Sequence, residues 1–147
     1  MKYHTKNELG NLDFSEAYVR EVMAKPGSFC LVADNVRIKP ENSKNRDIRL
    51  MRANGMEIHV DGAVSSVIRE GYKVYDAEGK LKESYADEAV AEEEYPEVFR
   101  QLPEGELCEV KKEDGQYVFA VACEAAAYDL YVGGTEDWED WDRFLNV

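Results

Sequence analysis

The sequence has no long run of apolar residues. Its longest runs, Phe29–Ala33 and Val118–Cys123, fall far short of the ~20 residues that a helix needs to cross a bilayer. The segment 1–14 contains neither an apolar stretch nor a small-residue cleavage site, so we expect no secretory leader. These two absences predict a cytoplasmic protein that makes no contact with a membrane.

Cysteine and the common catalytic motifs are also scarce. The three cysteines, Cys30, Cys108 and Cys123, form no CxxC pair, and an odd number in apolar, strand-like surroundings is typical of buried, reduced thiols. The chain contains no GxxxxGK[ST] or GxGxxG phosphate loop and no GxSxG nucleophile elbow. No cofactor is therefore expected, and the sequence leans away from an enzyme.

Histidine is nearly absent, with only His4 and His59 in the chain. A zinc site needs three or four ligands close together, whereas His59 and Glu57 on one face of a predicted strand supply two. The acidic turn 76–79 is too short for an EF-hand loop. The sequence therefore predicts no metal site.

Positive charge is in deficit, with 18 Lys/Arg against 31 Asp/Glu and a net charge of −13. This balance argues against nonspecific binding to nucleic acid or to an anionic membrane. The charge is unevenly distributed, because residues 1–52 carry a net +3 and residues 53–147 carry −16. This asymmetry is the clearest global feature of the sequence.

The 147 residues are enough for one domain, and nine Tyr, five Phe and two Trp supply core material. We expect a single domain over 1–147, with 1–12 extended or poorly ordered. The segment 54–85 is the expected centre of the core. Its turn signals Asn54-Gly55, Asp61-Gly62 and 76–79 alternate with short runs rich in Val, Ile and Tyr, as in a meander of strands. The side chains expected to be buried in this segment are Met56, Ile58, Val60, Val67, Val74 and Tyr75.

Further strands are predicted at 28–38, 46–53, 107–112, 117–123 and 128–132, with a bend at Asp34-Asn35. The run 63–71 is ambiguous: strand agrees with the flanking hairpin signals, and a helix ending at Gly71 is the alternative. Tight turns between the strands favour an α+β fold with an antiparallel sheet, as a meander or a partial barrel or sandwich.

Three helices are predicted. The first spans Ser15–Ala24, capped by Ser15 and stopped by Pro26-Gly27. A short helix covers about 92–102, with Pro96 in its first turn. Thr135 caps a C-terminal helix whose Trp138 and Trp141 lie on one face, and whether these two rings are buried or exposed stays open.

Two charged surfaces are candidate sites. A basic run within 37–52 suits a phosphate, a carboxylate or an acidic partner, although a charged edge that blocks aggregation is the alternative. Its members are Arg37, Lys39, Lys44, Arg46, Arg49 and Arg52. An acidic docking face is predicted from Glu92, Glu93, Glu94, Asp137 and Asp140, and it would attract a basic protein.

Three functional hypotheses follow. The first is a non-enzymatic protein-binding module, which rests on the absence of a catalytic constellation and on the separated charges. The second is an immunity-type inhibitor that docks its acidic face on a basic toxin. The third is a small-anion binder or enzyme whose site gathers Arg46, Arg49, His59 and Tyr72. The sequence does not define the oligomeric state.

Overall fold

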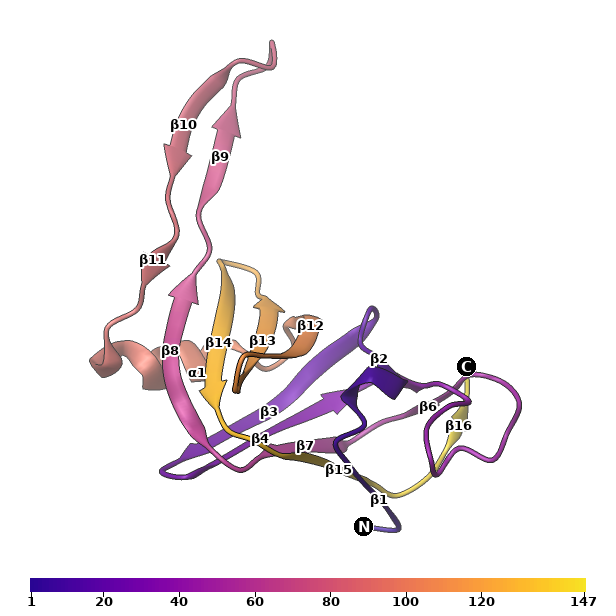
Figure 1. Cartoon of the computed structure of the whole chain (residues 1–147). Coiled ribbons are helices and arrows are strands. Elements are labelled where there is room, and N and C mark those ends of the chain that lie inside the picture. Colours follow the sequence, from indigo (N-terminus) through magenta and orange to yellow (C-terminus); the bar gives the residue numbers. More distant parts are fainter.

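The computed structural model describes residues 1–147 and is built mainly from antiparallel strands (Figure 1). Ten strands form one sheet that is not closed into a barrel. In spatial order they are β1 (Tyr3–Lys6), β15 (Asp137–Trp141), β7 (Met56–Val60), β4 (Ser28–Asp34), β3 (Ala17–Lys25), β12 (Glu106–Glu113), β13 (Gln116–Ala122), β14 (Ala127–Gly133), β8 (Ala63–Arg69) and β11 (Glu88–Ala89). The predicted antiparallel sheet is thus confirmed.

The remaining elements are small. A four-stranded sheet contains β16 (Leu145–Asn146), β6 (Met51–Ala53), β5 (Val36–Ile38) and β2 (Leu12–Asp13). A two-stranded ribbon contains β9 (Tyr72–Tyr75) and β10 (Leu81–Tyr85), and the helices are η1 (Leu9–Asn11), η2 (Glu92–Glu94) and α1 (Tyr95–Gln101). The structure contains no helix with the length and hydrophobicity of a membrane span.

The large sheet bends, so that β3, β4, β7 and β15 run across β8, β13 and β14 (Figure 1). A core of 26 buried residues includes residues from both halves, from the small sheet and from α1. Phe29 of β4 meets Phe119 of β13 with ring centroids 4.9 Å apart. Crossed packing of this kind lets one continuous sheet cover its own apolar face.

The segment 54–85 divides into a core part and a projecting part. Met56, Ile58, Val60 and Val67 are fully buried, as predicted. Val74 and Tyr75 were expected beside them, but the ribbon β9–β10 extends away from the body, which leaves Val74 half-buried and Tyr75 exposed (Figure 1).

The predicted helix Ser15–Ala24 is wrong, because this segment is the strand β3. Pro26-Gly27 is not a helix stop: it turns the chain between the paired residues Lys25 and Ser28, with Gly27 at a φ of 75°. Proline followed by a left-handed glycine is the signature of a tight turn that reverses the chain.

The predicted C-terminal helix is also wrong. Its residues form β15, which lies between β1 and β7, and the short strand β16. Trp141 is fully buried in the core, whereas Trp138 is half-buried on the opposite face. The lead-in 1–12, expected to be extended or poorly ordered, supplies β1 as the strand that covers the outer edge of β15.

Two turn signals proved to be something other than hairpin turns. Asn54-Gly55 lies opposite the bend at Asn35, within a long hairpin that pairs β4 with β7 and β5 with β6. The Asn54 side chain accepts a hydrogen bond from the Asn35 amide there. Asp61-Gly62 links β7 to β8, which do not pair with each other.

Other predictions are confirmed. The ambiguous run 63–71 contains the strand β8. The predicted short helix is η2 followed by α1, with Pro96 in its first turn. Gly79 has a φ of 84° in the loop of the ribbon. The predicted strand 46–53 is shorter than expected, because only Met51–Ala53 pairs.

Candidate functional site

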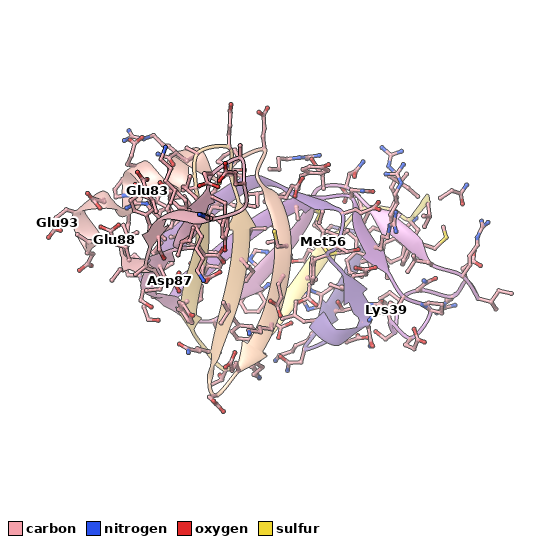
Figure 2. The ribbon with its side chains drawn as sticks, turned by 90° about the horizontal axis from the view of Figure 1, so that it is seen from above. Lys39, Met56, Glu83, Asp87, Glu88 and Glu93 are labelled. Atoms are coloured by element: carbon pink, nitrogen blue, oxygen red, sulfur yellow. The ribbon has the colours of Figure 1, made fainter.

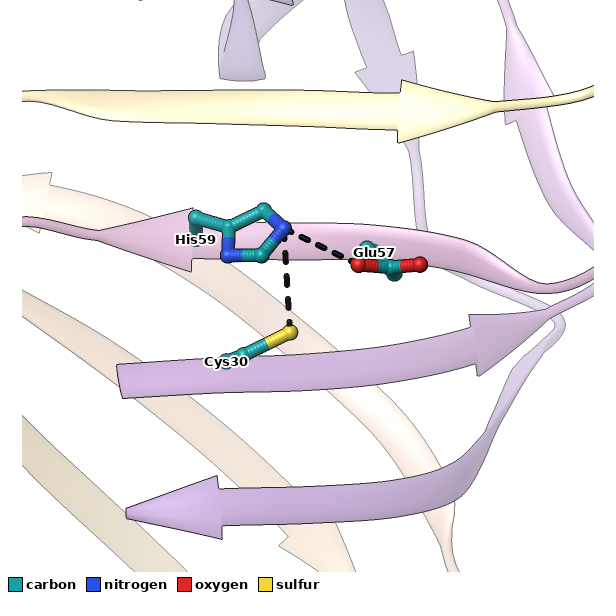
Figure 3. Close-up of side chains that lie close together, drawn as sticks. All are labelled: Cys30, Glu57 and His59. Carbon is teal, nitrogen blue, oxygen red and sulfur yellow. Dashed lines mark hydrogen bonds and ion pairs between the residues drawn. The ribbon is translucent and has the colours of Figure 1, made fainter. Parts of the chain in front are cut away.

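Side chains of the types that commonly ligate metal ions lie close together on the outer face of the sheet, away from the core. The strand register places Cys30 of β4 opposite His59 of β7, and Glu57 of β7 opposite Asp140 of β15. Side chains two residues apart on a strand share a face, so Glu57 and His59 point to the same side. Figure 3 shows the three side chains of Cys30, Glu57 and His59 converging.

The contacts of this cluster meet at the Nε2 atom of His59. Nε2 lies 3.2 Å from Glu57 Oε1, 3.5 Å from Asp140 Oδ2 and 3.9 Å from Cys30 Sγ. The ligand atoms of Cys30, Glu57 and His59 all lie within 4.8 Å of one another. The histidine is therefore the common neighbour of two carboxylates and a thiol.

Two further rings frame the cluster. Trp138 stacks on His59 with centroids 5.1 Å apart and ring planes 7° apart, which fixes the orientation of the imidazole. His4 of β1 approaches the other oxygen of Asp140, with an Nδ1–Oδ1 distance of 2.6 Å. Asp140 thus stands between the only two histidines of the chain.

The electrostatic field at the cluster is negative. Burial, together with the charges of Glu57, Glu21 and Asp140, raises the pKa of the Cys30 thiol to about 12. No lysine or arginine forms an ion pair with Glu57 or Asp140. A free thiol in these surroundings is protonated and a poor nucleophile, so the cluster as it stands does not favour cysteine-based catalysis.

Sequence reasoning paired Glu57 with His59 but missed the other members. Their contribution depends on which strands become neighbours, and a period-two pattern does not encode that. The sequence predicts a buried, reduced thiol at Cys30, and it places Asp140 on a helix and not on a strand beside β7. The one local signal was the spacing of Glu57 and His59 on a single strand face.

Most cations of the predicted basic run contact other residues of the chain and do not form one patch. Arg37 pairs with Glu16, Arg49 with Asp47, and Arg52 donates to the Asn146 carbonyl. Lys39 donates to the carbonyl oxygen of Gly10. Four of the six cations therefore already have protein partners.

Lys44 and Arg46, the other two cations, line an open hollow of about 900 Å³. Lys2 from the start of the chain lines the same hollow, together with Ile48 and Phe144. The hollow thus gathers cations from two separate segments of the chain.

The predicted acidic face does not form one surface. Glu92, Glu93 and Glu94 are exposed on η2, but Asp137 is 2% exposed and accepts a hydrogen bond from the Tyr117 hydroxyl. Asp140 belongs to the histidine cluster. In the view from above in Figure 2, Glu83, Asp87, Glu88 and Glu93 all lie toward one end and Lys39 toward the other, although β10, which carries Glu83, projects above η2 and α1 (Figure 1).

The ribbon β9–β10 carries a second concentration of unusual side chains. Four large apolar residues there are each 47–60% exposed: Tyr72, Tyr75, Leu81 and Tyr85. Tyr72 and Tyr85 are opposite each other and stack at 4.6 Å, which stiffens the ribbon. Sequence reasoning had assigned this hairpin to the core, so its exposure was missed.

A hollow of about 700 Å³ lies at the base of the ribbon, lined by Tyr72, Arg69, Glu70 and Tyr128 among others. Burial together with the nearby charges of Asp129 and Asp87 raises the pKa of the Glu70 carboxyl. The repulsion between these carboxylates would be relieved by an incoming cation.

The scattered set Arg46, Arg49, His59 and Tyr72 is not brought together. Arg46 lines the basic hollow, and Tyr72 lines the hollow at the ribbon base. His59 lies in the cluster on the sheet face, and Arg49 contacts Asp47 and Asn146.

Comparisons with known protein families, with curated proteins and with solved structures find no match.

Proposed function

We propose that this protein is a non-enzymatic binding domain that captures a basic protein through its projecting ribbon. The observation that carries the proposal is the exposure of four large apolar side chains on one two-stranded arm: Tyr72, Tyr75, Leu81 and Tyr85. Exposure of apolar surface to water is unfavourable, and its burial under a partner lowers the free energy of the complex. Tyrosines of this kind are common anchors of protein interfaces.

The charge around the ribbon base supports a basic partner. Residues 83–97 contain seven acidic and no basic side chains. Only two of the seven form an ion pair with a basic residue, Glu88 with Arg69 and Glu97 with Arg100. The hollow beside Glu70 suits an arginine or lysine side chain of the partner. Complementary charge accelerates encounter and rejects acidic competitors, and a basic toxin is one class of protein with the required surface.

Capture experiments with paired variants test this proposal. The tagged full chain is used to recover partners from the producing cells, and recovery is quantified by mass spectrometry. The double variant Tyr75→Ser, Leu81→Ser and the triple variant Glu92→Lys, Glu93→Lys, Glu94→Lys should each lower recovery of one basic protein at least about tenfold, because hot-spot residues contribute more than 1 kcal/mol each.

Matched controls separate these effects from general changes in surface chemistry. Ile48→Ser removes an apolar side chain that is 96% exposed but lies outside the ribbon. Glu41→Lys, Glu109→Lys, Asp142→Lys makes the same charge change at scattered exposed sites. Both controls should retain the partner. Equal recovery by all variants, or a partner that is acidic, would refute the proposal.

A second candidate function is binding of a small anion in the basic hollow. It is favoured by the convergence of Lys2, Lys44 and Arg46 there. Calorimetric titration with inorganic phosphate and with citrate should show saturable binding that Arg46→Ala weakens. Arg143→Ala, an exposed arginine outside the hollow, should leave binding unchanged. Absence of heat with both anions would exclude this function.

A further inference from the structure

We propose that Cys30, Glu57 and His59 form a binding site for a divalent transition metal ion of the zinc type. The site is separate from the ribbon, because its ligands come from β4 and β7 in the middle of the sheet. It supplies one sulfur, one nitrogen and one oxygen donor, which is a set that zinc accepts. The proposal therefore adds a ligand to the protein and does not depend on the ribbon.

The distances within the cluster support this assignment. In a tetrahedral site with metal–nitrogen bonds of about 2.0 Å and metal–sulfur bonds of about 2.3 Å, neighbouring ligand atoms lie about 3.3–3.6 Å apart. His59 Nε2 and Glu57 Oε1 are 3.2 Å apart, and Nε2 and Cys30 Sγ are 3.9 Å apart. Small side-chain rotations are enough to bring all three atoms to an ion.

The charge at the cluster favours a cation. Glu21, Glu57 and Asp140 surround the thiol, and Glu57 and Asp140 have only histidines as ionic partners. Lys6, whose backbone lies opposite Trp138, is paired with Glu136 instead. A divalent ion would offset this negative charge. As the Cys30–metal bond forms, the thiol proton leaves to solvent, as is usual for thiolate ligands.

The surroundings hold the ligands in place. The stacked Trp138 ring fixes the plane of His59, and Cys30 is itself buried. Asp140 Oδ2, 3.5 Å from Nε2, is placed to orient a water molecule in the fourth position. The sulfur and imidazole donors select zinc or cobalt over magnesium and calcium, which prefer oxygen ligands alone.

The competing interpretation is a plain ion-pair network, in which a protonated His59 lies between Glu57 and Asp140. The two interpretations differ at Cys30. A histidine ion pair does not need the sulfur atom, whereas a metal site of this composition requires a sulfur–metal bond. A measurement that reports on that bond therefore decides between them.

Cobalt(II) provides this measurement, because a thiolate–cobalt bond has an intense charge-transfer absorption. The full chain, reduced and stripped of metal, is titrated with Co²⁺ and then with Zn²⁺. We expect one Co²⁺ per chain, a charge-transfer band, and loss of the band when Zn²⁺ displaces the cobalt. Zn²⁺ should also raise the melting temperature, since it binds the folded chain.

Variants locate the bond. Cys30→Ser should abolish the band, and His59→Gln should weaken Co²⁺ binding at least about tenfold. Cys108→Ser, which removes an exposed cysteine on β12, should change neither. If Cys30→Ser fails to fold by circular dichroism, Glu57→Gln replaces it, with weakened Co²⁺ binding expected. No saturable binding of Co²⁺ or Zn²⁺, or a charge-transfer band that persists in folded Cys30→Ser, would overturn the proposal.

Discussion

Two acidic residues of β15 point into the core, where hydrophobic side chains are expected. Asp137 is 2% exposed and Glu139 is 0% exposed, and they flank the outward-facing Trp138. Tyr117 donates a hydrogen bond to one oxygen of Asp137, whereas both oxygens of Glu139 lack a partner. Burial, with the nearby Asp137 carboxylate, raises the pKa of Glu139 to about 10. Glu139 is thus protonated in the folded protein at neutral pH.

This protonation predicts a pH-dependent stability. The folded state retains the Glu139 proton that the unfolded state loses at an ordinary glutamate pKa near 4.5. The contribution is therefore fully present below pH 4.5 and is lost as pH rises toward about 10. Glu139→Gln removes the ionisation, so it should stabilise the fold at pH 8–9 by about 1–3 kcal/mol and flatten this pH dependence.

Urea unfolding at a series of pH values measures this effect. The control Glu113→Gln alters an exposed carboxylate and should follow the wild-type profile. A Glu139→Gln protein whose stability falls between pH 5 and 9 as steeply as that of the wild type would show that Glu139 is not the group responsible.

The burial of acidic residues such as Asp137 and Glu139 could not be predicted from the sequence. Met56, Ile58 and Val60 were predicted correctly because alternating apolar residues have only one favourable side to face. The same pattern places Asp137 and Glu139 outside, since it contains no information about buried acids. Cys30 and Asp140 likewise join His59 only because three strands happen to be neighbours.

At the scale of elements, the bend of the sheet depends on two glycine-rich links that run side by side. Asp61-Gly62 joins β7 to β8, and Gly134 begins the link from β14, which ends at Gly133, to β15. The Asp61 carboxylate accepts hydrogen bonds from the amides of Thr135 and Glu136. A Cβ atom on Gly62 would lie 1.3 Å from the Gly133 carbonyl oxygen, so the links approach as closely as backbones can.

Gly62→Ala should therefore destabilise the protein by about 3 kcal/mol, because the two backbones must move apart to make room for the Cβ atom. Gly10→Ala is the matched control, because a Cβ atom on Gly10 would have no neighbour within 4 Å, and its effect should stay within about 0.5 kcal/mol. Thermal unfolding followed by circular dichroism measures both. Equal melting temperatures for the two variants would contradict this account of the corner.

The ribbon β9–β10 contributes no residue to the core. Its ends meet at the base, where Gly71 approaches the carbonyl oxygen of Tyr85. Replacing residues 72–85 with a short Gly-Ser turn should shift the melting temperature by only a few degrees. The same deletion should abolish capture of the basic partner. A deletion that unfolds the domain would show that the ribbon has a structural role.

The helix predicted at 15–24 rests on Ser15 as its cap, on Pro26-Gly27 as its stop and on the helical spacing of Tyr18, Val22 and Met23. In β3, a bulge between Val19 and Glu21 shifts the register, so that Val19 and Val22 both pack toward the core, whereas Tyr18 and Met23 are exposed. The bulge interrupts the alternation that indicates a strand. The hairpins at 72–85 and 106–122 also contain register shifts, between Leu81 and Glu83 and between Leu107 and Glu109, but their turn residues mark them clearly, and they were predicted correctly.

Over the whole molecule, charge is separated along the long dimension of the fold. The η2–α1 segment, with Glu92, Glu93 and Glu94, lies at one end, and the loop that carries Lys44 and Arg46 lies at the other (Figures 1 and 2). Because the net charge is −13, the carboxylates at the acidic end repel one another. Self-repulsion of this kind destabilises the compact state, and salt screens it over a Debye length of about 10 Å at 0.1 M.

This charge distribution predicts a conflict between stability and binding. Glu92→Lys, Glu93→Lys, Glu94→Lys should raise the melting temperature at low salt, because it relieves repulsion at the acidic end, and the gain should shrink as salt is added. The same variant should lose the basic partner. Melting curves at 10 mM and 300 mM NaCl, measured beside the capture assay, test both effects. A variant that is less stable at low salt would mean that these glutamates stabilise the fold, and their cluster would then need no partner to explain it.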